Sequence, residues 1–143
     1  MILLHELENN RVAIMNPAEG VSAEDMIAEV PTGSKYRLIT NWGSISTQDL
    51  DDFQVALRVN YNPAVTENYF SWDIDAAKEI TKERLRNERI PLFEANDIAL
   101  RDAILANNAG DIATFTTERD RLRDAPLLAD SATTLEELRN ITL

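Results

Sequence analysis

The sequence has no cysteine, and it has only one histidine and four glycines among its 143 residues. Without cysteine, a disulfide, an iron–sulfur cluster and a thiolate metal site are excluded. The lone histidine, His5, cannot build a familiar zinc site unless several carboxylates join it. No glycine-rich phosphate loop occurs, and no serine lies in a nucleophile-elbow motif. We therefore expect a protein that is not an enzyme and has no cofactor.

Long apolar runs and an excess of basic residues are missing as well. No stretch approaches the roughly 20 apolar residues of a membrane-spanning helix. The first residues, MILLHELENN, lack the basic region and the long apolar run of a signal peptide. The chain has 14 basic and 25 acidic residues and a net charge of −11, and both of its halves are acidic. Binding to nucleic-acid phosphates is therefore disfavoured, and we expect a soluble protein that works without a membrane or nucleic acid.

The residues that are present show their strongest pattern between Asp73 and Asp124. Apolar residues from Ile74 to Ala99 recur at helical spacing on one face. Asn107-Asn108-Ala109-Gly110 predicts the end of that helix, and Asp111 predicts the start of the next. Pro91 predicts a bend, because proline removes a backbone hydrogen bond. This stretch predicts a long helix, a tight turn and a shorter helix folded back.

A second apolar seam starts near Ile90 and steps by three and four residues, as in a coiled coil. When the second helix folds back, the members of this seam meet in pairs: Ile104 with Ile112, Leu100 with Phe115, Asp97 with Arg119, and Phe93 with Leu122. The acid then lies opposite the base. We predict that these residues hold the hairpin together.

Another face of the long helix is left uncovered by this arrangement. We predict that it contacts the N-terminal domain or a partner chain through Arg84, Leu85, Glu88, Leu92, Ala95 and Ala99. Arg84 and Glu88 have i,i+4 spacing, and we interpret them as an ion pair that sets the register between helices. A chain with more apolar helix surface than it can cover tends to oligomerise or bind a partner.

The first part of the chain, residues 1–66, predicts a small and mainly β domain with one short helix. Strands are expected at Met1–Leu4, Val12–Met15, Lys35–Thr40 and Phe53–Asn60, the last because it alternates strictly. The short helix is expected from Ser22 to about Val30. Residues 41–52 are expected to form a loop, whose acidic cluster Asp49, Asp51 and Asp52 we interpret as surface acidity.

Residues 67–143 are expected to form the second domain. Tyr69, Phe70 and Trp72 precede the long helix and predict a small core that fixes the helix to the sheet. After the hairpin, Pro126 ends the second helix, and a capping box at Thr133–Glu136 predicts a short closing helix. The fold class is therefore α+β: a small β-rich domain, then a long antiparallel helical hairpin with a short C-terminal helix.

Several short motifs follow one another in a particular order along residues 28–40 and 67–138. They are Val30–Gly33 before Tyr36, Glu67–Asp73, Ala76–Ile80, Arg84–Leu92, Gly110-Asp111, Leu122–Asp124, Pro126 and Thr134–Leu138. This order resembles that of small proteins encoded in the tail gene clusters of tailed bacteriophages and prophages. Members of this group are labelled tail fibre assembly or virion structural proteins.

The resemblance implies a structural role in the virion tail for a protein made in the bacterial host cytoplasm. Its expected partners are other tail, fibre or baseplate proteins, or copies of itself, and the group has no catalytic residues to transfer. Two alternatives remain open at this point. One is a transient tail fibre assembly chaperone that is absent from the mature virion. The other is a small metal-dependent hydrolase that uses the acidic residues around Asp51.

Overall fold

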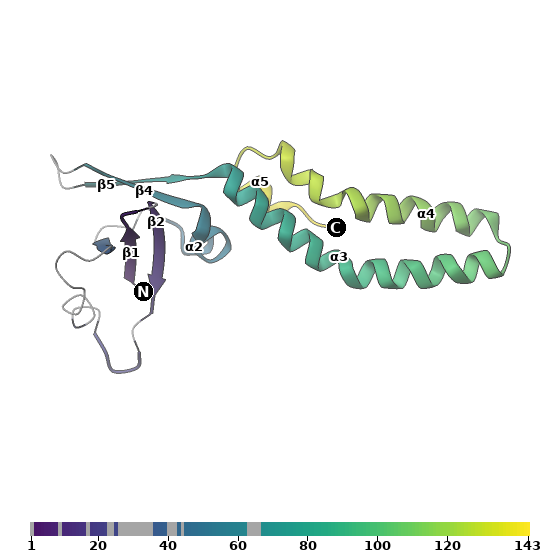
Figure 1. Ribbon diagram of the computed structural model, residues 1–143, viewed down its shortest axis with the longest axis horizontal. Helices are drawn as coiled ribbons and strands as arrows, with labels where there is room; N and C mark the ends of the chain where they lie inside the picture. The colour runs from purple at the N-terminus through teal and green to yellow at the C-terminus, as the bar shows by residue number, and fades with distance from the viewer. Residues whose placement is uncertain are drawn as a thin grey trace. The chain divides into compact units, whose positions relative to one another are not determined.

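A computed structural model describes residues 2–8, 10–16, 18–22, 25, 36–39, 43, 45–62 and 67–143. In these residues antiparallel strands precede two long helices and a short C-terminal helix, which confirms the predicted α+β class (Figure 1). The chain divides into two compact units, Met1–Ala77 and Lys78–Leu143. This boundary lies later than the expected residue 67, because β5 (Glu67–Trp72) pairs with a strand of the first unit.

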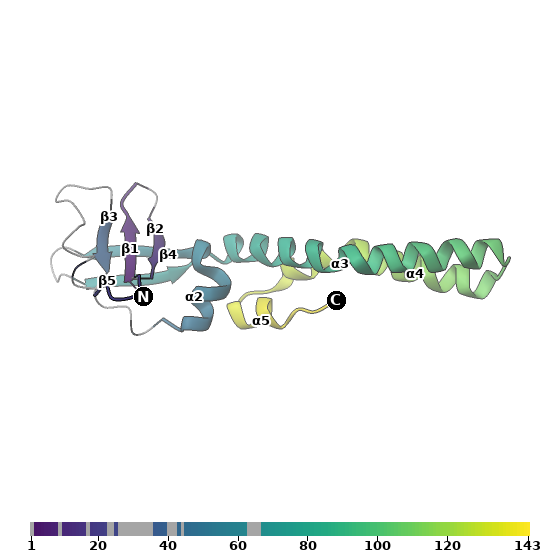
Figure 2. The ribbon, with the colours of Figure 1, turned by 90° about the horizontal axis from the view of Figure 1, so that it is seen from below.

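The first unit is built on two antiparallel ladders. In one ladder β1 (Ile2–Glu6) lies between β2 (Arg11–Met15) and β3 (Tyr36–Ile39) (Figure 2). In the other, β4 (Leu57–Asn62) pairs with β5. The three strands expected before residue 41 are therefore confirmed. The helix expected from Ser22 to Val30 lies mostly outside the described residues.

An apolar core forms between the described strands and helix α2 (Thr47–Phe53) of the first unit. Its buried members are Leu3, Val12, Ile39, Leu50, Leu57 and Val59. Phe70 and Trp72 pack against this core, whereas Tyr69 is half exposed. Alternate residues of a strand point to opposite faces, so β5 presents Phe70 and Trp72 inward and Tyr69 outward. The aromatic cluster predicted at this junction therefore belongs partly to the core of the first unit.

The strand expected over Phe53–Asn60 is wrong in its first half. Ser46 caps helix α2 (Thr47–Phe53), its hydroxyl accepting a hydrogen bond from the Asp49 backbone N at 3.4 Å. A 3-10 turn, η1 (Gln54–Ala56), follows before β4 begins. The alternation misleads because Phe53 is buried as the last residue of a helix, and Val55 is exposed. The acidic cluster accordingly lies on α2 and not in a loop.

The second unit contains most of α3 (Ile74–Leu105), then α4 (Ala109–Asp124), the 3-10 helix η2 (Ala125–Ser131) and α5 (Leu135–Asn140). α3 and α4 run antiparallel, and α3 changes direction near its middle (Figure 1). The helix contains Pro91. No described helix is long and apolar enough to cross a membrane.

The hairpin tip has the geometry of a helix stop followed by a cap. Asn107 adopts a positive φ of 54°, the backbone N of Asn107 donates to Ile104 O, and that of Asn108 donates to Ala103 O, each at 3.0 Å. These bonds satisfy the last carbonyl groups of α3. The Asn108 side chain then accepts a hydrogen bond from the Asp111 N at 3.3 Å and caps α4. The predicted turn is confirmed, although Gly110 lies within α4.

Candidate functional site

The hairpin of the second unit has two halves with different surroundings. We call residues 78–89 and 119–143 the basal half, and residues 90–118 the tip half. In the basal half, η2 and α5 return along α3 and are held to it by side chains of α3. Arg84 Nη2 donates to Leu138 O at 3.2 Å and to Ile141 O at 2.9 Å. Lys82 Nζ lies 2.7 Å from Asp130, and this hydrogen bond raises the pKa of Lys82.

The basal half also has an apolar core. Leu85, Leu122 and Leu138 have no exposed surface, and Thr81, Ala129 and Leu135 are buried as well. The prediction that Leu85 belongs to a partner interface is therefore wrong, because the chain covers this side chain itself. Arg84 is engaged by α5, and its ion pair with Glu88, at 3.6 Å, lies within α3. The sequence could not reveal this, because α5 reaches α3 from more than 50 positions away.

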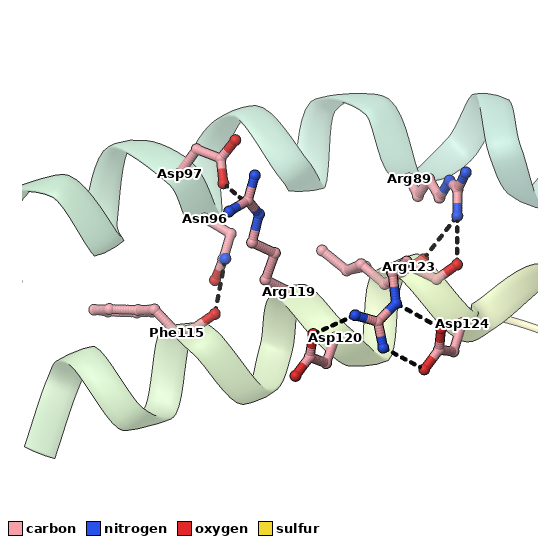
Figure 3. Close-up of polar contacts among 9 residues, drawn as sticks. Arg89, Asn96, Asp97, Phe115, Arg119, Asp120, Arg123 and Asp124 are labelled. Carbon is pink, nitrogen blue, oxygen red and sulfur yellow. Dashed lines mark hydrogen bonds and ion pairs between the residues drawn. The ribbon is translucent and has the colours of Figure 1, made fainter.

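The two long helices are joined by contacts that repeat from the end of the basal half to the tip of the hairpin. Arg89 Nη1 donates to Leu122 O at 3.2 Å and to Arg123 O at 2.7 Å, and Asn96 Nδ2 donates to Phe115 O at 2.9 Å (Figure 3). The bond from Asn108 N to Ala103 O closes the tip. On α3 the contacting residues Arg89, Asn96 and Ala103 are seven apart, and on the returning arm Leu122, Phe115 and Asn108 are also seven apart, which is the heptad period of a coiled coil.

The predicted seam is correct in part. The structure pairs Asp97 with Arg119 at 3.2 Å, as predicted (Figure 3). Leu122 is buried, and Phe93, Leu100, Ile112 and Phe115 are half-buried. Ile104, however, is 56% exposed, so its assignment to the seam is wrong.

The centre of the seam on α3 lies one residue earlier than predicted. Asn96 and Ala103 are buried, whereas their neighbours Asp97 and Ile104 are exposed. A buried amide is tolerated here because it donates to a backbone carbonyl. The missed signal was the seven-residue spacing of Arg89, Asn96 and Ala103, with a single asparagine inside the seam. Such an asparagine fixes the register of a coiled coil at some cost in stability.

A shallow groove beside the seam is lined by Phe93, Arg119, Asp120 and Arg123. Its arginines are matched by acids. Arg119 pairs with Asp97, and Arg123 contacts Asp120 and Asp124 at 2.7 and 2.8 Å (Figure 3). The guanidinium of Arg123 also lowers the pKa of Asp124. The groove therefore presents balanced charge, not an anion-binding site.

Large apolar side chains remain exposed on the tip half of α3. They are Ile90 (54%), Leu92 (42%), Ile98 (53%), Ile104 (56%) and Leu105 (78%). Of the remaining residues predicted to contact a partner, Glu88 and Ala95 are exposed and Ala99 is half-buried. Two packed helices cover only one stripe of each other, so a side of α3 without a third element stays open. The apolar surface of the tip half is the candidate functional site.

The single histidine, His5, lies in a polar cluster of the first unit. His5 is buried, with Nε2 3.1 Å from Asn10 Oδ1 and Nδ1 3.3 Å from Arg37 Nη2. A guanidinium can only donate, so Nδ1 accepts from Arg37 and Nε2 donates to Asn10. Among the described residues no group of three His, Asp or Glu side chains gathers where it could hold a metal ion.

Comparisons with known proteins identify no relative of this chain. The chain matches no protein-family model, and neither curated proteins nor solved structures give a match.

Proposed function

We propose that the chain is a non-enzymatic tail protein of a tailed bacteriophage or prophage. In this proposal it works in the virion tail and assembles with other tail, fibre or baseplate proteins, or with copies of itself. The tip half of the hairpin provides the contact surface. The assignment to a phage tail depends on the order of short motifs along residues 28–40 and 67–138.

One observation carries the assembly role: large apolar side chains of α3 are exposed in the tip half, whereas in the basal half Ile80 is half-buried and Leu85 is buried. Leu85 is buried beside a C-terminal segment that Arg84 and Lys82 hold in place. Ile98 and Leu105 are more than half exposed. Contiguous exposed apolar surface on a folded protein marks interaction sites. A partner would cover the apolar surface of α3 in the tip half, as η2 and α5 cover α3 in the basal half.

Mass spectrometry of purified particles tests the proposal. We expect peptides of this chain in finished virions of the phage that encodes it, in a fixed ratio to another tail protein. Absence from virions, with co-purification of a fibre protein from the lysate, would instead support the transient chaperone. Absence from both would contradict a tail role.

A matched pair of variants tests the surface. Ile98→Asp alters the tip half, and Leu127→Asp alters a similarly exposed residue of η2. Neither side chain is buried, so both variants should fold. We expect Ile98→Asp to prevent incorporation into particles and Leu127→Asp to be incorporated normally. Equal incorporation of both would show that the tip half is not the contact surface.

A further inference from the structure

Five exposed residues of α3 form a narrow stripe on the side of the helix away from α4. We call Ile90, Glu94, Ile98, Arg101 and Leu105 the outer stripe. At about 100° per residue they fall within roughly 80° of one another. Asn96 and Ala103, which are buried in the seam with α4, lie on the opposite side of the helix by the same count. The outer stripe is therefore separate from the contacts that hold the hairpin together.

The outer stripe has an order that is complementary to itself. Along the chain it reads apolar, acidic, apolar, basic, apolar. If two copies meet antiparallel about a two-fold axis near Ile98, Ile90 of one copy meets Leu105 of the other. Glu94 then meets Arg101 in two symmetry-related pairs, and Ile98 meets itself. An isologous interface of this kind needs a self-complementary surface.

A parallel arrangement would not fit. It would place Glu94 against Glu94 and Arg101 against Arg101, and opposed like charges disfavour association. Arg101 already contacts Asp102 at 3.0 Å, but this pair is exposed and within one helix. Pairs of that kind contribute little to stability, so the guanidinium remains available to a second acid. The order of the charges along the outer stripe therefore favours a second copy of this chain that packs antiparallel.

We infer that the hairpin forms a homodimer in which two α3 helices pack antiparallel through the outer stripe. The partner in this inference is a second copy of the same chain. The biological purpose of the dimer rests on the assembly role proposed above. The stripe is about 22 Å long at 1.5 Å per residue and no wider than one helix, about 10 Å, so it is smaller than the roughly 800 Å² per partner of a standard stable complex. The dimer should therefore be weak and reversible.

Sedimentation equilibrium of the full chain, from micromolar to millimolar concentration, tests the inference. We expect a reversible monomer–dimer equilibrium that Ile98→Asp weakens by at least about tenfold, because a charge would face its own copy across the axis. Leu127→Asp, at a similarly exposed residue of η2 outside the outer stripe, should leave the equilibrium unchanged. A chain that stays monomeric at millimolar concentration overturns the inference, as does a dimer that Leu127→Asp dissociates and Ile98→Asp does not.

Charge reversal tests the direction. Glu94→Arg and Arg101→Glu should each weaken the homodimer, because each places like charges opposite one another. The two variants mixed together should associate again, and the double variant with both reversals should regain the parent dimer. Single reversals without effect would exclude the antiparallel pairing. Circular dichroism of each variant controls for folding, which these exposed substitutions should not change.

The inference and the proposed function fail in different experiments. Loss of the dimer in solution, with the chain still present in virions, would leave the tail role standing and assign the outer stripe to another protein. A dimer with the expected variant pattern, from a chain absent from particles and fibre complexes, would support the inference and contradict the tail role.

Discussion

The two halves of the hairpin use the same helices but are held together differently. The basal half has three layers, since η2 and α5 cover α3, and it buries Leu85, Leu122 and Leu138 completely. The tip half has two helices, and its buried side chains are the amide of Asn96 and the methyl group of Ala103. The third layer therefore decides how much apolar surface a hairpin can bury.

This difference predicts a gradient of local stability. Apolar burial contributes most to stability, and regions with few buried apolar contacts open at lower free energy. The tip half relies on the hydrogen bond from Asn96 to a backbone carbonyl of α4 and on the backbone bond that closes the tip. Such bonds contribute little net stability but set one register. The basal half should thus act as the anchor and the tip half as the adaptable surface.

The largest expected loss of stability comes from a substitution in the core of the basal half. Leu122→Ala should lower the free energy of unfolding by about 3 kcal/mol, because it leaves a cavity where a side chain was fully buried. Leu105→Ala, in the exposed part of the tip half, should change it by less than about 0.5 kcal/mol. Thermal or urea denaturation followed by circular dichroism measures both. Equal losses would mean that the two halves do not differ in packing.

The next effect concerns the seam of the tip half. Asn96→Ala should cost about 1–2 kcal/mol, because it removes a buried donor to Phe115 O. Asp97→Ala removes the exposed pair with Arg119 and should cost less than about 0.5 kcal/mol. Hydrogen exchange should show that Asn96→Ala loses protection mainly in the tip half. A larger loss from Asp97→Ala would support the seam as first predicted from sequence.

A smaller loss of stability is expected when the N-terminal cap of α5 is removed. Thr134 and Glu137 form a capping box at the start of α5, with the Thr134 Oγ1 accepting from the Glu137 N at 3.1 Å. Thr134→Ala should cost about 1 kcal/mol. Loss of the cap should loosen α5, so hydrogen exchange should increase in the basal half and stay unchanged in the tip half. An increase confined to the tip half would contradict this assignment.

The same cap predicts a pH dependence. The hydrogen bond from the Thr133 backbone N lowers the pKa of Glu137 below its ordinary value of 4.5. A lowered pKa in the folded state means that the contribution of the carboxylate is present above pH 4.5 and is lost as the pH falls below that value. The stability difference between the parent and Glu137→Gln should therefore shrink in acid. The difference caused by Thr134→Ala should not follow that trend.

The smallest effect lies at the tip. Asn107 has a positive φ, which glycine adopts more easily, so Asn107→Gly should change stability by no more than about 0.5 kcal/mol. Asn108→Ala should instead cost about 1 kcal/mol, because it removes the cap of α4. Thermal denaturation of the pair distinguishes these roles. A larger loss at Asn107 would place the essential cap one residue earlier.

Local patterns predicted local features well. The hairpin, its turn at Asn107-Asn108 and the pair of Asp97 with Arg119 could be expected from helical periodicity and stop signals. The rotation of the seam could not, because Ile104 is more apolar than Ala103 and yet lies outward. Whether Asn96 is buried depends on a carbonyl of the opposite helix being within reach.

Features that depend on distant segments were harder to predict. Leu85 was expected to face a partner, because nothing in the sequence indicates that α5 returns to α3. The start of β4 was misplaced because Phe53 and Val55 continue its alternation, although the cap at Ser46 begins a helix. The partner surface was predicted at Arg84, Leu85, Glu88, Leu92, Ala95 and Ala99, and none of these residues belongs to the outer stripe, because which side of α3 stays exposed depends on where α4 and α5 pack.

The seven-residue interval between the contacts of Arg89, Asn96 and Ala103 has a consequence for the length of the hairpin. Seven extra residues in each helix beyond Asn96 would extend both arms by about 10 Å and keep every seam residue on its side. A single inserted residue would rotate the end of α3 by about 100° and carry Ala103 out of the contact. Related chains with hairpins of other lengths should therefore differ from this one in multiples of seven residues per arm.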